Sequence, residues 1–103
     1  MEKIYYPYPA KDGIHKYYII TKSGKKVSFG AAGYSDFTIH KDEERKKRYI
    51  ARHMNRENWT KSGIDTTGWW SRFYLWSYPT KKEAYKHIKK DLKDWGLNLR
   101  MLN

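Results

Sequence analysis

The sequence predicts a small α+β domain, in which a β-hairpin packs on two main helices with a short aromatic helix between them. Three observations predict this fold. Residues 15–21 are rich in β-branched and aromatic side chains and are followed by a turn sequence. Acidic residues come before basic ones over residues 42–48, as at the start of a helix. A capping box begins at Thr80.

Length and composition fit a single folded domain. The chain has 103 residues, of which 17% are aromatic, and it contains no cysteine. We expect an extended arm over residues 1–13, a globular body over residues 14–96 and a short tail over residues 97–103. The missing cysteines exclude disulfides, thiolate zinc sites and a cysteine nucleophile. No apolar run is long enough to span a bilayer, and the aromatic content argues against a disordered chain.

The N-terminal arm combines tyrosines with prolines. Tyr5, Tyr6 and Tyr8 surround Pro7, and Pro9 follows. Proline pushes the residue before it toward extended geometry, so the arm is predicted to be extended rather than helical. It could lie over the core of its own domain or dock on a neighbouring subunit, and the sequence leaves both alternatives open.

The hairpin is predicted from residues 15–21 and 26–30. A turn sequence, Lys22–Lys25, joins the two strands. Val27 and Phe29 alternate with polar residues and therefore share one face. Since a lone hairpin is marginally stable in water, we expect this face to pack on the helices or on another strand.

The middle helix is predicted over about residues 42–56. At about 100° per residue, Tyr49, Ile50 and His53 share one arc, which we expect to face the core. The neighbouring arc carries a row of basic residues. Four of them, which we name the arginine stripe, are candidates for contact with phosphates or with an acidic partner: Arg45, Arg48, Arg52 and Arg56.

Like charges four residues apart destabilise an isolated helix by about 0.2–0.5 kcal/mol per pair, so acidic groups are expected to offset the stripe. The chain's own acids could do so. The sequence offers four of them, namely Asp36, Glu44, Glu57 and Asp65. Alternatively, phosphates or a partner's carboxylates could offset the positive charge of the stripe. The planar guanidinium group forms paired hydrogen bonds with either kind of anion.

An aromatic run predicts the short helix over residues 69–76. Its spacing is typical of a core-facing stripe, although one or two tryptophans could lie at a partner surface. Together with the tyrosines of the arm, the candidate aromatic interface anchors are Tyr5, Tyr6, Tyr8, Trp59, Trp69 and Trp70.

The last helix is predicted from the capping box of Thr80 and Glu83 to about Asp94. One face is apolar and the opposite face is rich in lysine. A solvated face is the simpler interpretation, but Lys86 and Lys90 are also candidates for contact with an acidic partner or phosphate.

No motif for catalysis, metal binding or phosphate cradling is present. His40, Glu44 and His53 lack the spacing of a zinc-protease helix, and no glycine-rich phosphate loop occurs. We therefore expect a protein that is not an enzyme, with no catalytic residues, metal, cofactor or small-molecule substrate.

The formal net charge of +11 favours acidic partners, which could be an acidic protein surface, nucleic acid or an anionic membrane face. The excess of positive charge is divided among residues 1–30, 41–61 and 81–95 rather than concentrated in a tail. The fold must therefore assemble any basic surface.

Two segments carry a resemblance. The run FGAAGYSDFTIHKD at residues 29–42 with the following residues 45–53, and the segment from residues 57–60 through the aromatic residues 68–76, resemble a family of short basic proteins encoded by large double-stranded DNA viruses of algae and amoebae. The resemblance covers about residues 25–92. Glu43 stands where the family has proline, a change that matters little in the first turn of a helix. The family has no assigned activity, so the resemblance implies a viral origin and no catalytic residues.

Together these observations lead us to expect a small basic structural protein of the virion. It would be a minor capsid or capsid-lining component that packs between larger subunits, with the major capsid protein or other minor components as partners. We expect it in the capsid, and in the host cytoplasm or nucleus during assembly. The alternative is a nucleic-acid-binding viral protein that stacks Trp59 or Trp69 on bases.

Overall fold

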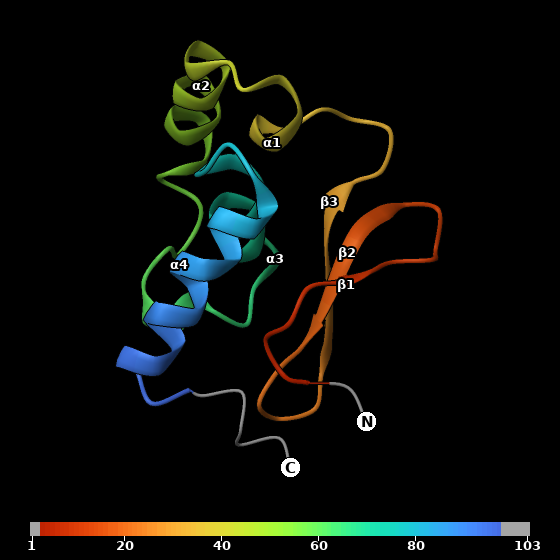
Figure 1. Cartoon of the computed structure of the whole chain (residues 1–103), viewed down its shortest axis with the longest axis vertical. Helices are drawn as coiled ribbons and strands as arrows, with labels where there is room; N and C mark the ends of the chain where they lie inside the picture. Colours follow the sequence, from red (N-terminus) through yellow and green to blue (C-terminus); the bar gives the residue numbers. More distant parts are fainter. Residues whose placement is uncertain (1–2, 98–103) are drawn as a thin grey trace.

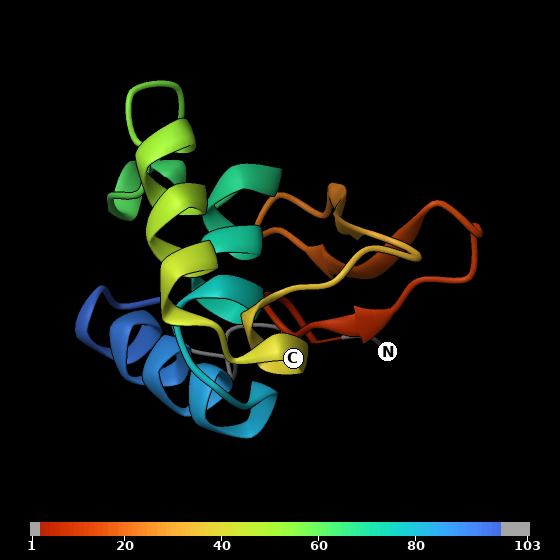
Figure 2. The ribbon, with the colours of Figure 1, turned by 90° about the horizontal axis from the view of Figure 1, so that it is seen from above.

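A computed structural model describes residues 3–97 of the chain. Within these residues, a three-stranded antiparallel sheet packs against helical segments, which confirms the α+β class (Figure 1). Figure 2 shows the segment that contains α3 and η2 between the sheet and α2, and both neighbours contact it. The hydrophobic core lies between the sheet and the helices, with Phe29, Trp70 and Ile88 among its fully buried residues.

The predicted hairpin is present. Strands β2 (His15–Ile20) and β3 (Lys26–Ala31) pair antiparallel, with Tyr17 opposite Phe29. Val27 and Phe29 are buried, as their alternation predicts. A third short strand, β1 (Tyr8–Pro9), pairs with β2, so the order β1-β2-β3 leaves β3 at an edge of the sheet.

The N-terminal arm lies on the core of its own domain. Ile4 and Tyr5 are buried, and the Tyr5 ring stacks on Trp70 at 6.4 Å between centroids. The Tyr5 hydroxyl donates to Asp65 Oδ1 at 2.7 Å, and burial with this neighbouring carboxylate raises the pKa of Tyr5 to about 12. The arm is therefore part of the globular body, and the prediction that Tyr5 anchors an interface is wrong.

The middle of the chain forms two helices rather than the single predicted one. Helix α1 (Phe37–His40) was not predicted; the Asp36 side chain caps it by accepting from the Thr38 N–H. Helix α2 (Glu43–His53) begins at Asp42, whose carboxylate accepts from the N–H groups of Glu44 and Arg45. Because α2 ends at His53, Arg56 lies in the turn that follows the helix.

The aromatic run folds as predicted, into α3 (Thr67–Trp70) and the π-helical segment η2 (Ser71–Trp76), after a short 3-10 turn, η1 (Lys61–Gly63). Trp69 and Trp70 are fully buried. The prediction that they anchor an interface is therefore wrong, because the sheet and α4 enclose this segment within the domain's own core.

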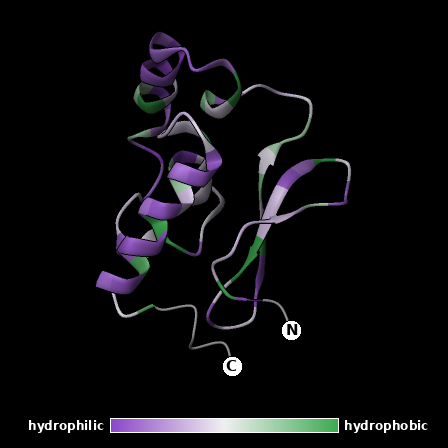
Figure 3. Ribbon diagram, in the orientation of Figure 1, coloured by the Kyte–Doolittle hydropathy of each residue, from purple (hydrophilic) through white to green (hydrophobic). Residues whose placement is uncertain are grey.

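Helix α4 (Lys81–Asp94) begins at the predicted capping residue, since Thr80 Oγ1 accepts from the Glu83 N–H at 3.1 Å. Ala84, Ile88 and Leu92 face the core, while hydrophilic residues cover the outer face of α4 and most of α2 (Figure 3). Leu97 packs against the core, and the rest of the predicted tail lies outside the described residues.

Candidate functional site

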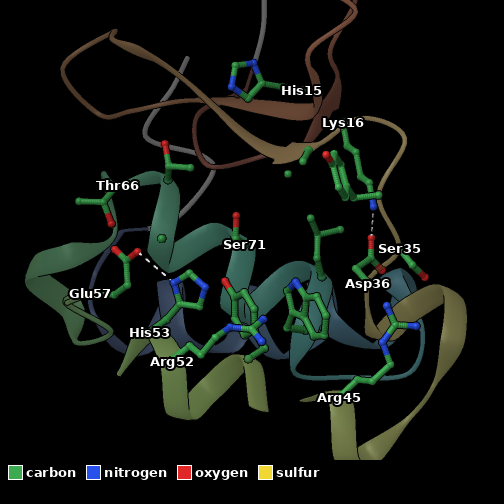
Figure 4. Close-up of a pocket in the computed structure, with 18 of the residues that line it drawn as sticks. His15, Lys16, Ser35, Asp36, Arg45, Arg52, His53, Glu57, Thr66 and Ser71 are labelled. Carbon is green, nitrogen blue, oxygen red and sulfur yellow. Dashed lines mark hydrogen bonds and ion pairs between the residues drawn. The ribbon is translucent and has the colours of Figure 1, made fainter. Parts of the chain in front are cut away.

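A groove of about 860 Å³ lies between the hairpin, α2 and the α3–η2 segment (Figure 4). His15, Lys16 and Gly30 line it from the hairpin, and Thr66 and Ser71 line it from the α3–η2 side. From α2, the side chains of Arg45, Tyr49, Arg52 and His53 reach it. The groove therefore joins segments that are far apart in the sequence.

Packing between α2 and the core fixes the α2 wall of the groove. Tyr49 is the buried residue of α2, and its ring packs on Trp76 of η2. Lys46 Nζ donates to the Ser77 carbonyl at 2.8 Å and also lies 4.8 Å from the centre of the Phe37 ring. These contacts tie the helix to η2 and α1, so the residues on its groove side have a defined position.

Two members of the arginine stripe face the groove. Arg45 and Arg52 line it and are exposed, and their seven-residue separation corresponds to about 10 Å along a helix. Arg48 and Arg56 are also exposed but do not line the groove. The stripe is thus divided between the groove and the outer surface.

None of the four arginines of the stripe forms an ion pair with a carboxylate among residues 3–97. The four acids that the sequence offered as internal partners are engaged elsewhere. Asp36 pairs with Lys16, Glu44 with Lys47 and Glu57 with His53, while Asp65 accepts from the Tyr5 hydroxyl. Within residues 3–97, the interpretation in which these four acids neutralise the stripe is therefore wrong.

The other basic side chains of the groove lie close to acidic partners. Lys16 Nζ lies 2.5 Å from Asp36 Oδ2, and His53 Nδ1 lies 3.7 Å from Glu57 Oε2. His15 Nδ1 lies 2.8 Å from Asp12 Oδ2, and these contacts hold the pKa of Asp12 well below its usual range. Within the described part of the chain, Arg45 and Arg52 are left as the groove's cations without an acidic partner.

An exposed apolar pair adjoins this basic surface. Ile14 is 67% exposed and Tyr34 is 73% exposed, and both line the groove. Sequence reasoning missed them, and it also missed His15, Lys16 and Ser71. No local pattern marks these residues, because the fold alone brings them beside α2.

The remaining predicted site residues lie elsewhere. Lys86 lines a second groove of about 730 Å³ together with Tyr6, and Lys90 pairs with Asp94 at 3.1 Å. Tyr6 and Tyr8 are half-buried and pack on Tyr85 and Tyr18 of the same domain. These residues are not brought together with the arginine stripe.

Trp59 is held within the chain. Its Nε1–H donates to the Gly68 carbonyl at 3.2 Å, and the Arg72 guanidinium lies 4.6 Å from its ring centre. Its half-buried ring therefore has one face covered by the protein's own arginine. Trp69 is fully buried, so the prediction that it stacks on bases is wrong.

The described residues contain no cluster of three or more histidines and carboxylates that could hold a metal ion. Within the same residues, no helix is both long and apolar enough to cross a membrane. What the groove offers chemically is two guanidinium groups that pair with no carboxylate of residues 3–97, together with hydroxyl groups and an apolar rim. This set can bind an anionic group together with an apolar one.

No significant similarity was found to a curated protein or to a solved structure. Residues 8–53 match the model of a family of unknown function, DUF5754. The matched segment runs from β1 to the end of α2, so it contains Arg45 and Arg52 but not the α3–η2 wall of the groove. Over these residues the chain is similar to that family, and because the family's function is unknown, the similarity indicates no activity.

Proposed function

We propose that this chain is a small structural protein of a virion, a minor capsid or capsid-lining component that packs between larger subunits. It acts by binding an acidic surface of a larger capsid protein rather than by catalysis. The viral assignment rests on the resemblance of residues 29–42 and 68–76. The single observation that supports the binding role is the arginine stripe, which is exposed and has no ion pair within residues 3–97.

Four exposed guanidinium groups on one short segment carry an electrostatic cost that the described chain does not offset. Arg48 and Arg52 lie four residues apart on α2, and such a like-charged pair costs a helix about 0.2–0.5 kcal/mol. An acidic partner removes this repulsion and gains charge-assisted hydrogen bonds in return. Arginine is also enriched in the binding hot spots of protein interfaces. A protein partner with an acidic surface therefore fits the stripe.

The test begins with purified virions that are stripped layer by layer. We expect the chain to leave the particle together with shell proteins. Recovery of the chain in the genome fraction alone, or its complete absence from particles, would contradict the proposal.

A binding assay with purified shells isolates the contribution of the stripe. A variant with all four arginines of the stripe changed to glutamate should lose binding. The matched control changes four exposed lysines outside the stripe, Lys11, Lys22, Lys25 and Lys61, to glutamate. It has the same net charge and should retain most of the binding; equal losses in both variants would indicate only a general charge effect.

One observation favours a second candidate function, binding of single-stranded nucleic acid. Tyr34 is exposed and lines the same groove as Arg45 and Arg52, and exposed aromatic rings together with cations are a common platform for bases. This alternative predicts binding to oligonucleotides that weakens steeply as salt rises. Binding that is flat between low and moderate salt would exclude it.

A further inference from the structure

We propose that the groove between the hairpin and α2 holds an extended acidic segment of the partner protein. Carboxylates of this segment pair with Arg45 and Arg52, and one of its apolar side chains packs on Ile14 and Tyr34. This inference rests on the proposed function, because it takes the partner to be a protein, and it specifies where and by what chemistry that partner is bound.

Charge defines the anionic contacts. Lys16, His15 and His53 already lie close to Asp36, Asp12 and Glu57, respectively. Arg45 and Arg52 therefore offer the groove's free positive charge. Their separation is about 10 Å along α2, and side chains on one face of an extended peptide recur every two residues, about 7 Å apart. Long glutamate and arginine side chains can span the difference, so two carboxylates on one face of the peptide can meet both arginines.

The apolar rim defines the second contact. The exposed large hydrophobic residues among residues 3–97 are Ile14, Tyr34, Ile39 and Met54, and two of these line the groove. A rim of this kind beside cations fits a peptide that alternates acidic and apolar side chains. It offers nothing to a purely ionic ligand.

The end of an edge strand forms the hairpin side of the groove. Gly30 and Ala31 are the last residues of the edge strand β3, and both line the groove. Gly30 has a φ of 76°, which favours glycine, so this end of the strand carries no side chain at Gly30. An extended chain can lie alongside the end of an edge strand.

The mixture of charges favours a protein segment over a nucleic acid. A nucleic acid carries a phosphate at every nucleotide, and strong binders neutralise many of them. The Glu57 carboxylate, whose side chain is 30% exposed, lies in the groove and repels a continuous row of phosphates. A peptide can place a neutral residue opposite Glu57 and keep its acids for the two arginines.

The experiment uses a fluorescein-labelled peptide in which glutamate and leucine alternate, so that an extended chain presents all its glutamates on one face. Its binding to the full-length chain is measured by fluorescence anisotropy. The Arg45→Glu/Arg52→Glu variant should bind at least about tenfold more weakly, because two charge-assisted contacts become repulsive. The Arg48→Glu/Arg56→Glu variant is the matched control. It changes the net charge by the same amount and also alters two arginines of the stripe, but neither of them lines the groove. It should stay within about threefold of the unaltered chain.

Folding is checked by circular dichroism and thermal unfolding. All four arginines are exposed and free of ion pairs within residues 3–97, so both double variants should fold normally. As a test of the rim, Ile14→Ser/Tyr34→Ser should weaken binding several-fold. Ile39→Ser, which removes an exposed apolar residue outside the groove, should not.

Three outcomes would overturn the inference. The first is that the unaltered chain fails to bind the peptide. The second is that the Arg45→Glu/Arg52→Glu and Arg48→Glu/Arg56→Glu variants weaken binding equally. The third is that labelled oligothymidine of the same net charge binds more tightly than the peptide and is no longer bound by the Arg45→Glu/Arg52→Glu variant, which would make the groove a nucleic-acid site. If the four-arginine variant still loses shell binding while the two pairs are equivalent, the proposed function stands and only the groove assignment fails.

Discussion

The indole ring of Trp76 lies flat on the phenol ring of Tyr49, with centroids 4.4 Å apart and planes 2° from parallel. The His53 ring packs against Tyr49 at 4.4 Å between centroids. Since Tyr49 is the buried residue of α2, this stack is the main apolar attachment of the helix to η2. It therefore sets the distance between the groove arginines and the opposite wall.

Loss of this stack should destabilise the protein. Tyr49→Ala removes a buried aromatic ring, and we expect the free energy of unfolding to fall by about 3–5 kcal/mol. Tyr49→Phe is the matched control, because it keeps the ring; it should change stability by less than about 1 kcal/mol. Thermal or urea unfolding measures both. Similar stabilities for the two variants would show that the stack contributes little.

The ion pair of Lys16 and Asp36 ties β2 to the start of α1. The Asp36 side chain is 2% exposed, and it also accepts a hydrogen bond from the Thr38 N–H at 2.9 Å. Lys16→Met leaves a buried carboxylate without its counter-charge, so we expect a loss of about 3 kcal/mol in urea unfolding. Lys25→Met, at an exposed position, should change stability by less than about 0.5 kcal/mol. A harmless Lys16→Met would contradict this role.

Two glycines differ in what a side chain would meet. A Cβ atom on Gly63 would lie 1.9 Å from the Asn58 carbonyl oxygen, whereas one on Gly68 would meet the end of the flexible Glu57 side chain at 2.0 Å. The backbone must move in the first case, so Gly63→Ala should cost about 1–3 kcal/mol or more. Gly68→Ala should cost less, because the carboxylate can rotate away. Equal thermal unfolding midpoints would disprove the difference.

His40 should make stability dependent on pH. Its Nδ1 accepts from the Asp42 N–H at 2.9 Å, so the neutral ring carries its proton on the buried Nε2. Burial, followed by the charge of Arg45, lowers the pKa of His40 below its ordinary value of 6.5, while Asp42 and Asp36 oppose this shift. Below pH 6.5 the unfolded chain therefore binds more protons at this residue than the folded chain.

We thus expect the free energy of unfolding to fall as the pH drops through 6.5 toward the lowered value. His40→Gln keeps a hydrogen-bond acceptor but does not titrate, so its stability should fall less over the same interval. Urea unfolding at about pH 7 and about pH 5 measures the two slopes. Parallel slopes would rule out His40 as the titrating group.

Local signals predicted the elements that depend on neighbouring residues. The helix start near Asp42 was predicted from acidic residues that precede basic ones, and the start at Thr80 was predicted from its capping box. The hairpin was predicted from its turn sequence and the alternation of its second strand. Helix α1 was missed, because four residues are too few to show a helical period.

Composition identified aromatic and arginine residues as important but could not say which were free. Trp69 and Trp70 are buried in the core. Tyr34, which no sequence pattern identified as a candidate, is exposed and lines the groove. The arginine stripe was visible in the sequence, but its lack of ion pairs among residues 3–97 was not.

The sequence by itself thus determined the basic character of the protein, its hairpin and the arginine stripe, of which Arg45, Arg48 and Arg52 lie on α2. Only the tertiary structure decided that Asp36, Glu57 and Asp65 are occupied by other partners, and that Arg45 and Arg52 face a groove. The physical reason is the range of the interactions. Capping and periodicity act over a few residues, whereas an ion pair needs two groups within a few ångströms, and the packing of distant segments sets that distance.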